Sequence, residues 1–336
     1  FHVQHLLQMP NVDVVALCDN YRPHLEDAAQ YYPQAKQYDD YRRLLEDRNV
    51  QGVIITTPLY LHARMTIDAL RAGKRVFCEK SMAFTLDEAL DVYNCRKELG
   101  GVLLIGQQRL FDPKYIKAMQ MIHEGVIGDV VGVRNYWYRN NNWRREVPSP
   151  ELERHINWRL YSEYSRGLMT ELACHQLQNG SWAMGMLPEQ VMGSGHLVHW
   201  TKEDERDVYD TVSAIFTYPN GVNMTFESII SNKHFGMGEQ ILGTKGTIDL
   251  VTAMHYTDEA APKGSGMDQL IAQIESGIMS NSVFAGTSWA AETATLAPGM
   301  PIMPNVKVVS GESSVGAEAD GSKELLEAFI HAVITG

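Results

Sequence analysis

Short apolar runs alternate with longer amphipathic stretches through the first third of the chain, and this alternation limits the folds open to it. The runs predict strands at 14–18, 53–57, 75–78 and 102–105. The stretches predict helices at 21–32, 39–47, 61–72 and 85–99. Strands that alternate with helices in this way are typical of βαβ units, whose strands lie parallel in one sheet. We therefore predict an α/β fold with a Rossmann-type, doubly wound parallel sheet.

The pattern changes after Gly106. Helices are predicted at 112–125 and 168–184, and β-type runs at 129–139, 191–200, 210–218, 222–231, 236–243 and 247–251. Between two of these runs, Pro219-Asn220-Gly221 is a strong signal for a hairpin turn. Successive runs joined by such turns predict an α+β domain with a large, mostly antiparallel sheet.

The remaining residues complete a division into two domains. Residues 258–322 are rich in Gly, Ser, Ala and Pro, so we expect an insertion or a long loop there. A closing helix is predicted at 323–333. We therefore divide the chain into a first domain at 1–106 and an α+β domain at 107–336.

The charge balance limits the partners. The 336 residues include 29 Lys and Arg against 41 Asp and Glu, a formal net charge of −12. Neither a nucleic acid nor a membrane is therefore expected as a partner. The four cysteines lack paired spacing, so no disulfide framework and no metal site are expected. We expect a cytoplasmic protein, and an exported form stays open because a leader would lie before Phe1.

Polar side chains follow three of the predicted parallel strands. Asp19 follows the first, Thr57-Pro58 ends the second, and Glu79-Lys80 ends the third. The carboxyl ends of parallel strands line the crevice where such sheets bind ligands. A carboxylate at the position of Asp19 binds the ribose hydroxyls of NAD, although it equally suits a helix cap. NAD is the expected cofactor, and the nearby Arg22 leaves NADP possible.

No glycine-rich phosphate loop occurs before Asp19. Residues 1–9 resemble the helix that would follow such a loop, and Pro10-Asn11 would end it. We therefore expect the first strand and its glycine loop to precede Phe1.

A second candidate site lies in the helix predicted at 168–184. Glu171 and His175 are four residues apart, so both project from one helix face. A carboxylate beside an imidazole raises its basicity, as a general base for an alcohol requires. An ordinary surface pair or a satisfied core histidine would give the same spacing.

An aromatic cluster lies between these two candidate sites. Its members are Tyr136, Tyr138, Trp143, Arg144, Arg145, Asn157, Trp158, Arg159, Tyr161 and Tyr164. Aromatic faces, amides and guanidinium groups are suited to a carbohydrate or a polyol. The same residue types are enriched at subunit interfaces, so both readings stay open.

These residues together resemble the Gfo/Idh/MocA oxidoreductases, which are NAD(P)-dependent sugar and polyol dehydrogenases. The resemblance rests on Ala16-Leu17-Cys18-Asp19, on Thr57-Pro58 with His62, on Glu79-Lys80, and on the run from Gly167 to His175. Three positions depart from the family pattern. Ser81 replaces Pro, Glu171 replaces Asp, and Gln178 replaces an acid. A cis bond before Ser costs about 2.5–4 kcal/mol, so the backbone there is expected to differ.

The resemblance implies an enzyme that transfers a hydride between a nicotinamide cofactor and a sugar, glycoside or polyol hydroxyl. It implies His175 as the base, Lys80 as the group that polarises the reacting oxygen, and Glu171 as the residue that positions His175 or binds a neighbouring hydroxyl. Cofactor-binding residues would be Asp19, Thr57, Pro58, His62, Glu79, Lys80, Arg109 and Trp158. Substrate-binding residues would be Tyr138, Trp143, Arg144, Asn157 and Tyr161. A homo-oligomer formed through the large sheet is also implied.

Two other functions are also compatible with the sequence. One is an NAD-dependent, redox-assisted glycoside hydrolase or lyase, which would recycle NADH instead of accumulating it. The other is a non-catalytic relative that binds the cofactor, for which the departures at Ser81 and Glu171 would be the support.

Overall fold

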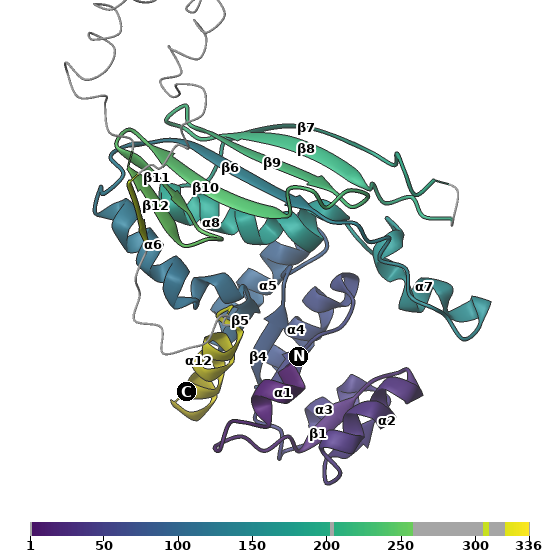
Figure 1. Cartoon of the computed structure of the whole chain (residues 1–336). Helices are drawn as coiled ribbons and strands as arrows, with labels where there is room; N and C mark the ends of the chain where they lie inside the picture. Colours follow the sequence, from purple (N-terminus) through teal and green to yellow (C-terminus); the bar gives the residue numbers. More distant parts are fainter. Residues whose placement is uncertain (1, 202–204, 258–304, 309–319, 336) are drawn as a thin grey trace, which may run out of the picture.

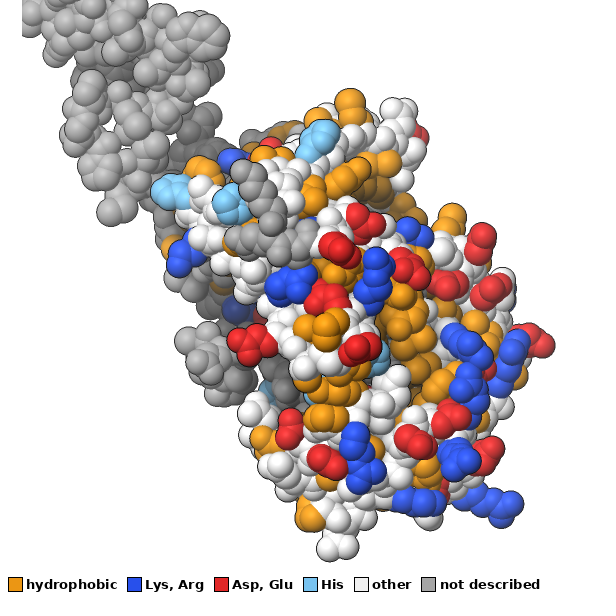
Figure 2. Space-filling view, turned by 90° about the vertical axis from the view of Figure 1, so that its right-hand side faces the viewer, with side chains coloured by type: hydrophobic (Ala, Val, Ile, Leu, Met, Phe, Trp, Pro, Cys, Tyr) orange, Lys and Arg blue, Asp and Glu red, His pale blue; other side chains and the backbone are white. Residues whose placement is uncertain are grey.

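The computed structural model describes residues 2–201, 205–257, 305–308 and 320–335 (Figure 1). Parallel strands flanked by helices form its lower part, and a large curved sheet lies above them. Acidic and basic side chains are interspersed over the face seen in Figure 2. Among the described residues, no helix is long and apolar enough to cross a membrane.

The first part contains five parallel strands in two sheets. β1 (Ala16–Cys18) pairs with β2 (Lys36–Tyr38), while β3 (Gly52–Ile55), β4 (Arg75–Glu79) and β5 (Leu103–Gly106) form the second sheet in that order. Its helices are α1 (His2–Leu6), α2 (Arg22–Tyr31), α3 (Tyr41–Glu46), α4 (His62–Arg71) and α5 (Leu86–Leu99). The predicted α/β arrangement is confirmed, but β1 and β3 are not paired in the described residues.

Helix α5 begins where the sequence predicts. The Thr85 hydroxyl accepts a hydrogen bond from the Glu88 amide at 3.2 Å, and the Glu88 carboxylate accepts one from the Thr85 amide at 3.0 Å. This capping box satisfies two amide groups that an open helix end would leave unpaired. Gly100 ends the helix with φ of +60°, a conformation that favours glycine.

The second part contains an eight-stranded sheet with the order β13-β12-β11-β10-β6-β9-β8-β7. The strands are β6 (Val130–Tyr138), β7 (Gln190–His196), β8 (Thr211–Thr217), β9 (Asn223–Ile229), β10 (Met237–Gly243), β11 (Gly246–Asp249), β12 (Met254–Thr257) and β13 (Asn305–Val308). Within this sheet, β6 and β9 are the only described neighbours that run parallel. The predicted mostly antiparallel sheet is therefore confirmed.

Two helices cover the inner face of this sheet (Figure 1). They are α6 (Pro113–His123) and α8 (Cys174–Met184), and a π-helical turn, Met169–Ala173, leads into α8. The core between them includes Val133 and Ile241 from the sheet and Met119 from α6. The described residues before 202 also form the short helix α7 (Glu153–Ile156) and four 3₁₀ turns: Leu59–Leu61, Gln108–Leu110, Pro150–Leu152 and Trp158–Leu160.

One strand contradicts the loop predicted at 258–322. β13 lies within that range and pairs antiparallel with β12. A four-residue strand in a Gly- and Ser-rich surrounding has too short a pattern to be recognised by alternation. The rest of the predicted loop, 258–304 and 309–319, lies outside the described residues.

The last helix, α12 (Ser322–Thr335), corrects the predicted domain division (Figure 1). Its Leu326 and Phe329 are buried against Phe77 of β4, in a cluster that also contains Leu6. Gly52 of β3 lies so close to this helix that an added Cβ would be 3.0 Å from Val333. Residues 322–335 therefore pack with the first part, because their apolar face covers the parallel sheet.

Candidate active site

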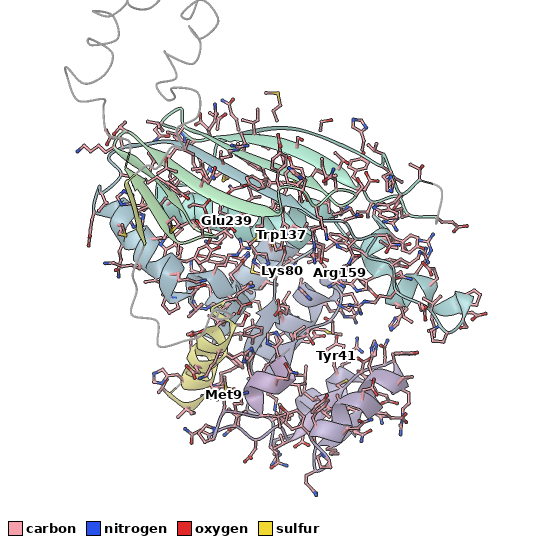
Figure 3. The ribbon with its side chains drawn as sticks, in the orientation of Figure 1. Met9, Tyr41, Lys80, Trp137, Arg159 and Glu239 are labelled. Atoms are coloured by element: carbon pink, nitrogen blue, oxygen red, sulfur yellow. The ribbon has the colours of Figure 1, made fainter. Side chains whose placement is uncertain are left out.

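The site lies between the carboxyl ends of the parallel strands and the inner face of the large sheet. Lys80 follows β4, and its Nζ donates a hydrogen bond to the Glu171 carbonyl oxygen at 2.8 Å. The same Nζ lies 3.7 Å from the Glu171 carboxylate. Figure 3 shows Lys80 between the two sheets, with Trp137 above it toward the large sheet and Arg159 to its right. The structure thus brings together two of the three predicted catalytic residues directly.

His175, the third, lies on α8 and is buried, with 6% of its surface exposed. Its Nδ1 lies 3.1 Å from Oε1 of Gln107, and its ring lies 6.3 Å from that of Trp137. An amide oxygen only accepts, so Nδ1 carries the proton and Nε2 keeps its lone pair. Burial, with smaller contributions from Arg109 and Lys80, lowers the pKa of His175 to about 2. His175 is therefore a neutral imidazole.

Gln107 was not among the predicted site residues. This residue follows β5 directly and occupies the place beside His175 that we expected for Glu171. The rule that identified Asp19 and Lys80, a polar residue after a parallel strand, applies equally to Gln107.

Glu171 is oriented by a different partner. Its Oε2 accepts a hydrogen bond from Arg159 Nε at 2.8 Å, and only 8% of its surface is exposed. Arg159 stacks on the ring of Trp158 at 4.3 Å. Glu171 therefore joins two cations, Lys80 and Arg159. Of the aromatic cluster identified in the sequence, Arg159 is the member with a hydrogen bond to the predicted catalytic residues.

His62 connects the backbone segments that follow two of the parallel strands. His62 is buried, and its two ring nitrogens lie 2.7 Å from the Ser81 carbonyl oxygen and 2.8 Å from that of Thr57. It ties the turn after β3, which includes Pro58, to the turn after β4. The Lys80–Ser81 peptide bond is cis, contrary to the expectation from the sequence.

Glu79 stays close to its own backbone. Its carboxylate accepts a hydrogen bond from the Lys80 amide at 3.0 Å, and the other oxygen lies 2.6 Å from His2 Nε2. Burial alone would raise the pKa of Glu79, but His2 and Lys80 outweigh it and lower that pKa. Glu79 is thus an anion that fixes the backbone at Lys80.

Asp19 stands at the end of β1. One carboxylate oxygen accepts a hydrogen bond from the Tyr21 amide at 2.8 Å, and the other lies 3.7 Å from the His24 ring. This bond is local and does not cap α2, whose N-cap is Tyr21, so Asp19 keeps acceptor capacity for a ligand hydroxyl. This donor and acceptor set fits NAD: Asp19 would hold the ribose, and Lys80 and His175 would lie at the reacting end.

Arg109 lies elsewhere than the prediction placed it. It is buried in the second part, where it forms an ion pair with Glu239 of β10. Its guanidinium group lies 5.4 Å from the ring of Trp137. Burial raises the pKa of Glu239, and the charge of Arg109 opposes this shift. This placement does not support Arg109 as a cofactor ligand.

Three predicted substrate residues are joined to one another by Glu153. Its carboxylate accepts hydrogen bonds from Arg144 at 2.9 Å, Asn157 at 3.2 Å and Tyr161 at 2.7 Å. The donors of these three side chains are therefore already bonded to Glu153, although a sugar site would need them for the sugar hydroxyls. These contacts shape the segment that carries Arg159.

Two further members of the predicted substrate set are placed differently from each other. The hydroxyl of Tyr138 donates to Glu227 at 2.7 Å on the outer face of the large sheet, opposite Trp137, which does not support a role in substrate binding. Trp143 has a φ of +61°, and its side chain packs against the apolar cluster that contains Leu172 and Ala173. Its role in substrate binding stays a prediction.

The segment 150–166, here termed the arm, reaches across to the first part. The His155 ring lies 6.3 Å from Tyr21, the Tyr164 ring lies 5.0 Å from Tyr60, and Arg166 lies 3.8 Å from the ring of Phe84. The contacted residues Tyr21, Tyr60 and Phe84 follow β1, β3 and β4 respectively. The arm therefore spans the ends of three parallel strands.

Comparisons with known proteins agree with this geometry. Residues 1–107 match the family described as "Oxidoreductase family, NAD-binding Rossmann fold", and residues 115–249 match the "GFO/IDH/MocA C-terminal domain". Over 271 residues, the chain is 24% identical to scyllo-inositol 2-dehydrogenase (NAD(+)) of Bacillus subtilis, covering 80% of this chain and 75% of that protein.

Two solved structures share the fold. An oxidoreductase domain protein from Kribbella flavida gives a TM-score of 0.67 at 24% identity and covers 79% of this chain and 75% of its own. The WlbA dehydrogenase of Chromobacterium violaceum, in complex with NADH and UDP-GlcNAcA, gives 0.64 at 19% identity and covers 74% and 69%. The two family matches together span more than half of the chain. The chain belongs to the Gfo/Idh/MocA family of NAD-binding oxidoreductases.

Proposed function

We propose that this protein is an NAD-dependent dehydrogenase that oxidises a secondary hydroxyl of a cyclic polyol or sugar. The observation that carries the proposal is a neutral, buried His175 in the same site as the Lys80 cation, at the ends of parallel strands. Relatives named as inositol dehydrogenases support a polyol as the substrate class.

The chain's own groups divide the proton chemistry between them. Nδ1 of His175 donates to Gln107, so Nε2 accepts the hydroxyl proton. Lys80 donates a hydrogen bond to the reacting oxygen and stabilises the negative charge that develops on it. Glu171 holds Lys80 through its carbonyl oxygen and carboxylate. Bound NAD would supply the carbon that accepts the hydride. The substrate hydroxyl would thereby become a ketone.

Asp19 supports NAD over NADP. Its carboxylate would face the ribose hydroxyls, and a 2′-phosphate would meet a like charge there. Replacing Asp19 by Ser would bring the affinities for NAD and NADP closer together, because it removes the carboxylate that repels the 2′-phosphate. Dissociation constants for both cofactors, measured by the fluorescence of bound NADH and NADPH, would test this point.

A homo-oligomer formed through the large sheet is also part of the proposal. On β7, an edge strand of the described sheet, Met192 is 70% exposed, and Ile215, its partner on β8, is 40% exposed. Apolar side chains exposed together on one face of a sheet are typical of contact surfaces. Sedimentation velocity of the wild type and of a Met192→Lys variant would test the state of association.

The decisive experiment uses the natural protein, with any residues that precede Phe1. We expect incubation with NAD and a panel of inositols, sugars and glycosides to yield stoichiometric NADH and a product about two mass units lighter, as hydride transfer from an alcohol requires. Lys80→Met and His175→Gln should each lower kcat by about 10²-fold or more. Cleaved glycoside without net NADH would contradict the proposal, as would near-normal turnover in both variants.

A further inference from the structure

Glu239 is a fully buried carboxylate that takes no direct part in the site. It lies on β10, on the inner face of the large sheet, and 0% of its surface is exposed. Figure 3 shows it near Trp137, on the side of the sheet that faces Lys80. A buried charge is costly unless it is paired, so its partners indicate what it holds in place.

Two of the three side chains that bind Glu239 come from the segments that carry the base and its orienting group, and the third comes from α6. Oε1 forms the ion pair with Arg109, in the 3₁₀ turn Gln108–Leu110, and accepts a hydrogen bond from the Tyr115 hydroxyl at 3.4 Å. Oε2 accepts a hydrogen bond from Asn179 Nδ2 at 2.8 Å. Asn179 lies on α8, one turn after His175.

The same two elements meet a second time at the site. Gln107, two residues before Arg109, accepts the hydrogen bond from His175, four residues before Asn179. Two links therefore join the turn after β5 to α8. One is the direct contact between Gln107 and His175. The other runs from Arg109 through Glu239 to Asn179.

We propose that Glu239 is a positioning residue, which holds Gln107 against His175 and so maintains the Nδ1-protonated tautomer of the base. The role of His175 as the base rests on the function proposed above. Without this clamp, the side chain of Gln107 would lose its fixed distance from the ring. A base with the wrong tautomer presents an N–H to the substrate where a lone pair is needed.

Three charged groups lie around His175. Lys80 faces it from the end of β4 and Arg109 from the turn after β5, while Glu171 lies on its own helical segment. Glu239 neutralises Arg109. Hence Glu239 acts on His175 through both the position of the turn and the charge of Arg109.

The test observes the tautomer directly. Protein labelled with ¹⁵N in its histidine rings gives distinct nitrogen signals for the two neutral tautomers, and the His175→Gln variant assigns the signal of His175. We expect only the Nδ1-protonated form in the wild type. We expect a mixture of both tautomers in Glu239→Gln and in Asn179→Leu, which cuts the link to α8 but keeps the ion pair.

Kinetics provide the second readout. Both variants should lose about tenfold or more in kcat, because a misplaced base acts only in the chemical step. The dissociation constant for NAD should change by less than about twofold, because Glu239 lies away from the strand ends. The tautomer readout also separates the two proposals, since it answers even if no polyol is oxidised.

Asp249→Asn is the matched control. Asp249 is another buried carboxylate of the same sheet, and it bonds to Gln240 and to the amides of Val251 and Thr252. Its loss should lower the melting temperature and leave the tautomer unchanged. The inference is overturned if folded Glu239→Gln and Asn179→Leu proteins keep the wild-type tautomer. It is equally overturned if Asp249→Asn mixes the tautomers as they do.

Discussion

At the scale of single residues, the surroundings of His175 determine both its protonation and the pH response of the fold. Burial and two nearby cations keep the imidazole neutral when the protein is folded. In the unfolded chain the same ring binds a proton below a pH of about 6.5. The unfolded state therefore takes up more protons as the pH falls, and folding loses free energy in that range.

A stability difference with a defined sign follows. We expect the free energy of unfolding of the wild type to fall below pH ~6.5 by up to about 1.4 kcal/mol per pH unit more than that of His175→Gln. Urea denaturation of both proteins between pH 5 and pH 8, a range of about 3 units around the histidine pKa, measures this difference. If the free energies of unfolding of the two proteins changed equally with pH, His175 would bind its proton as readily in the folded protein as in the unfolded chain.

At the scale of elements, the sequence predicted those whose end signals are local. The capping box of α5 and the hairpin turn before β9 needed only neighbouring residues. β2 was missed because Lys36-Gln37-Tyr38 has no apolar run, and its pairing with β1 is its only signal. The aromatic cluster suited either a substrate site or a subunit interface, and in the structure Glu153 binds three of its members to one another. Which neighbour satisfies a polar side chain depends on tertiary structure, and composition does not reveal it.

The arm offers a test at this scale. Glu153→Ala should cost about 1–3 kcal/mol, because Arg144, Asn157 and Tyr161 lose their common acceptor. Hydrogen exchange should rise in residues 144–161, which the lost bonds hold together. Glu163→Ala is the control, since its ion pair with Arg154 is exposed and worth less than about 1 kcal/mol. Equal exchange in both variants would show that the arm is held by other contacts.

At the scale of the whole molecule, both fold types could be predicted from the sequence, whereas the packing of residues 322–335 against the parallel sheet could not. Alternation and turn signals distinguish a parallel from an antiparallel sheet. They do not tell which sheet a terminal amphipathic helix will cover. The contact of Phe329 with Phe77 joins residues that are far apart in the chain, and only the folded structure shows it.

This long-range contact predicts a large effect from a remote substitution. Phe329→Ala should destabilise the parallel-sheet part by about 3–5 kcal/mol, because it opens a cavity beside Phe77. Tm and NAD affinity would both report the loss, with the affinity falling as the first part loosens. Glu327→Ala, on the exposed side of the same helix, should change stability by less than about 0.5 kcal/mol. A similar Tm for both variants would contradict the packing role of α12.

The place of α12 also sets an order of events during synthesis. The parallel strands leave the ribosome first, but the apolar surface of Phe77 is covered only when Leu326 and Phe329 arrive. Until then the nascent chain exposes that surface, while the large sheet is being completed. Domains that are contiguous in sequence can fold in turn as they emerge. The parallel-sheet part includes residues 322–335, so its maturation waits for them, and a ribosome stalled before residue 322 would carry an unfinished nucleotide domain.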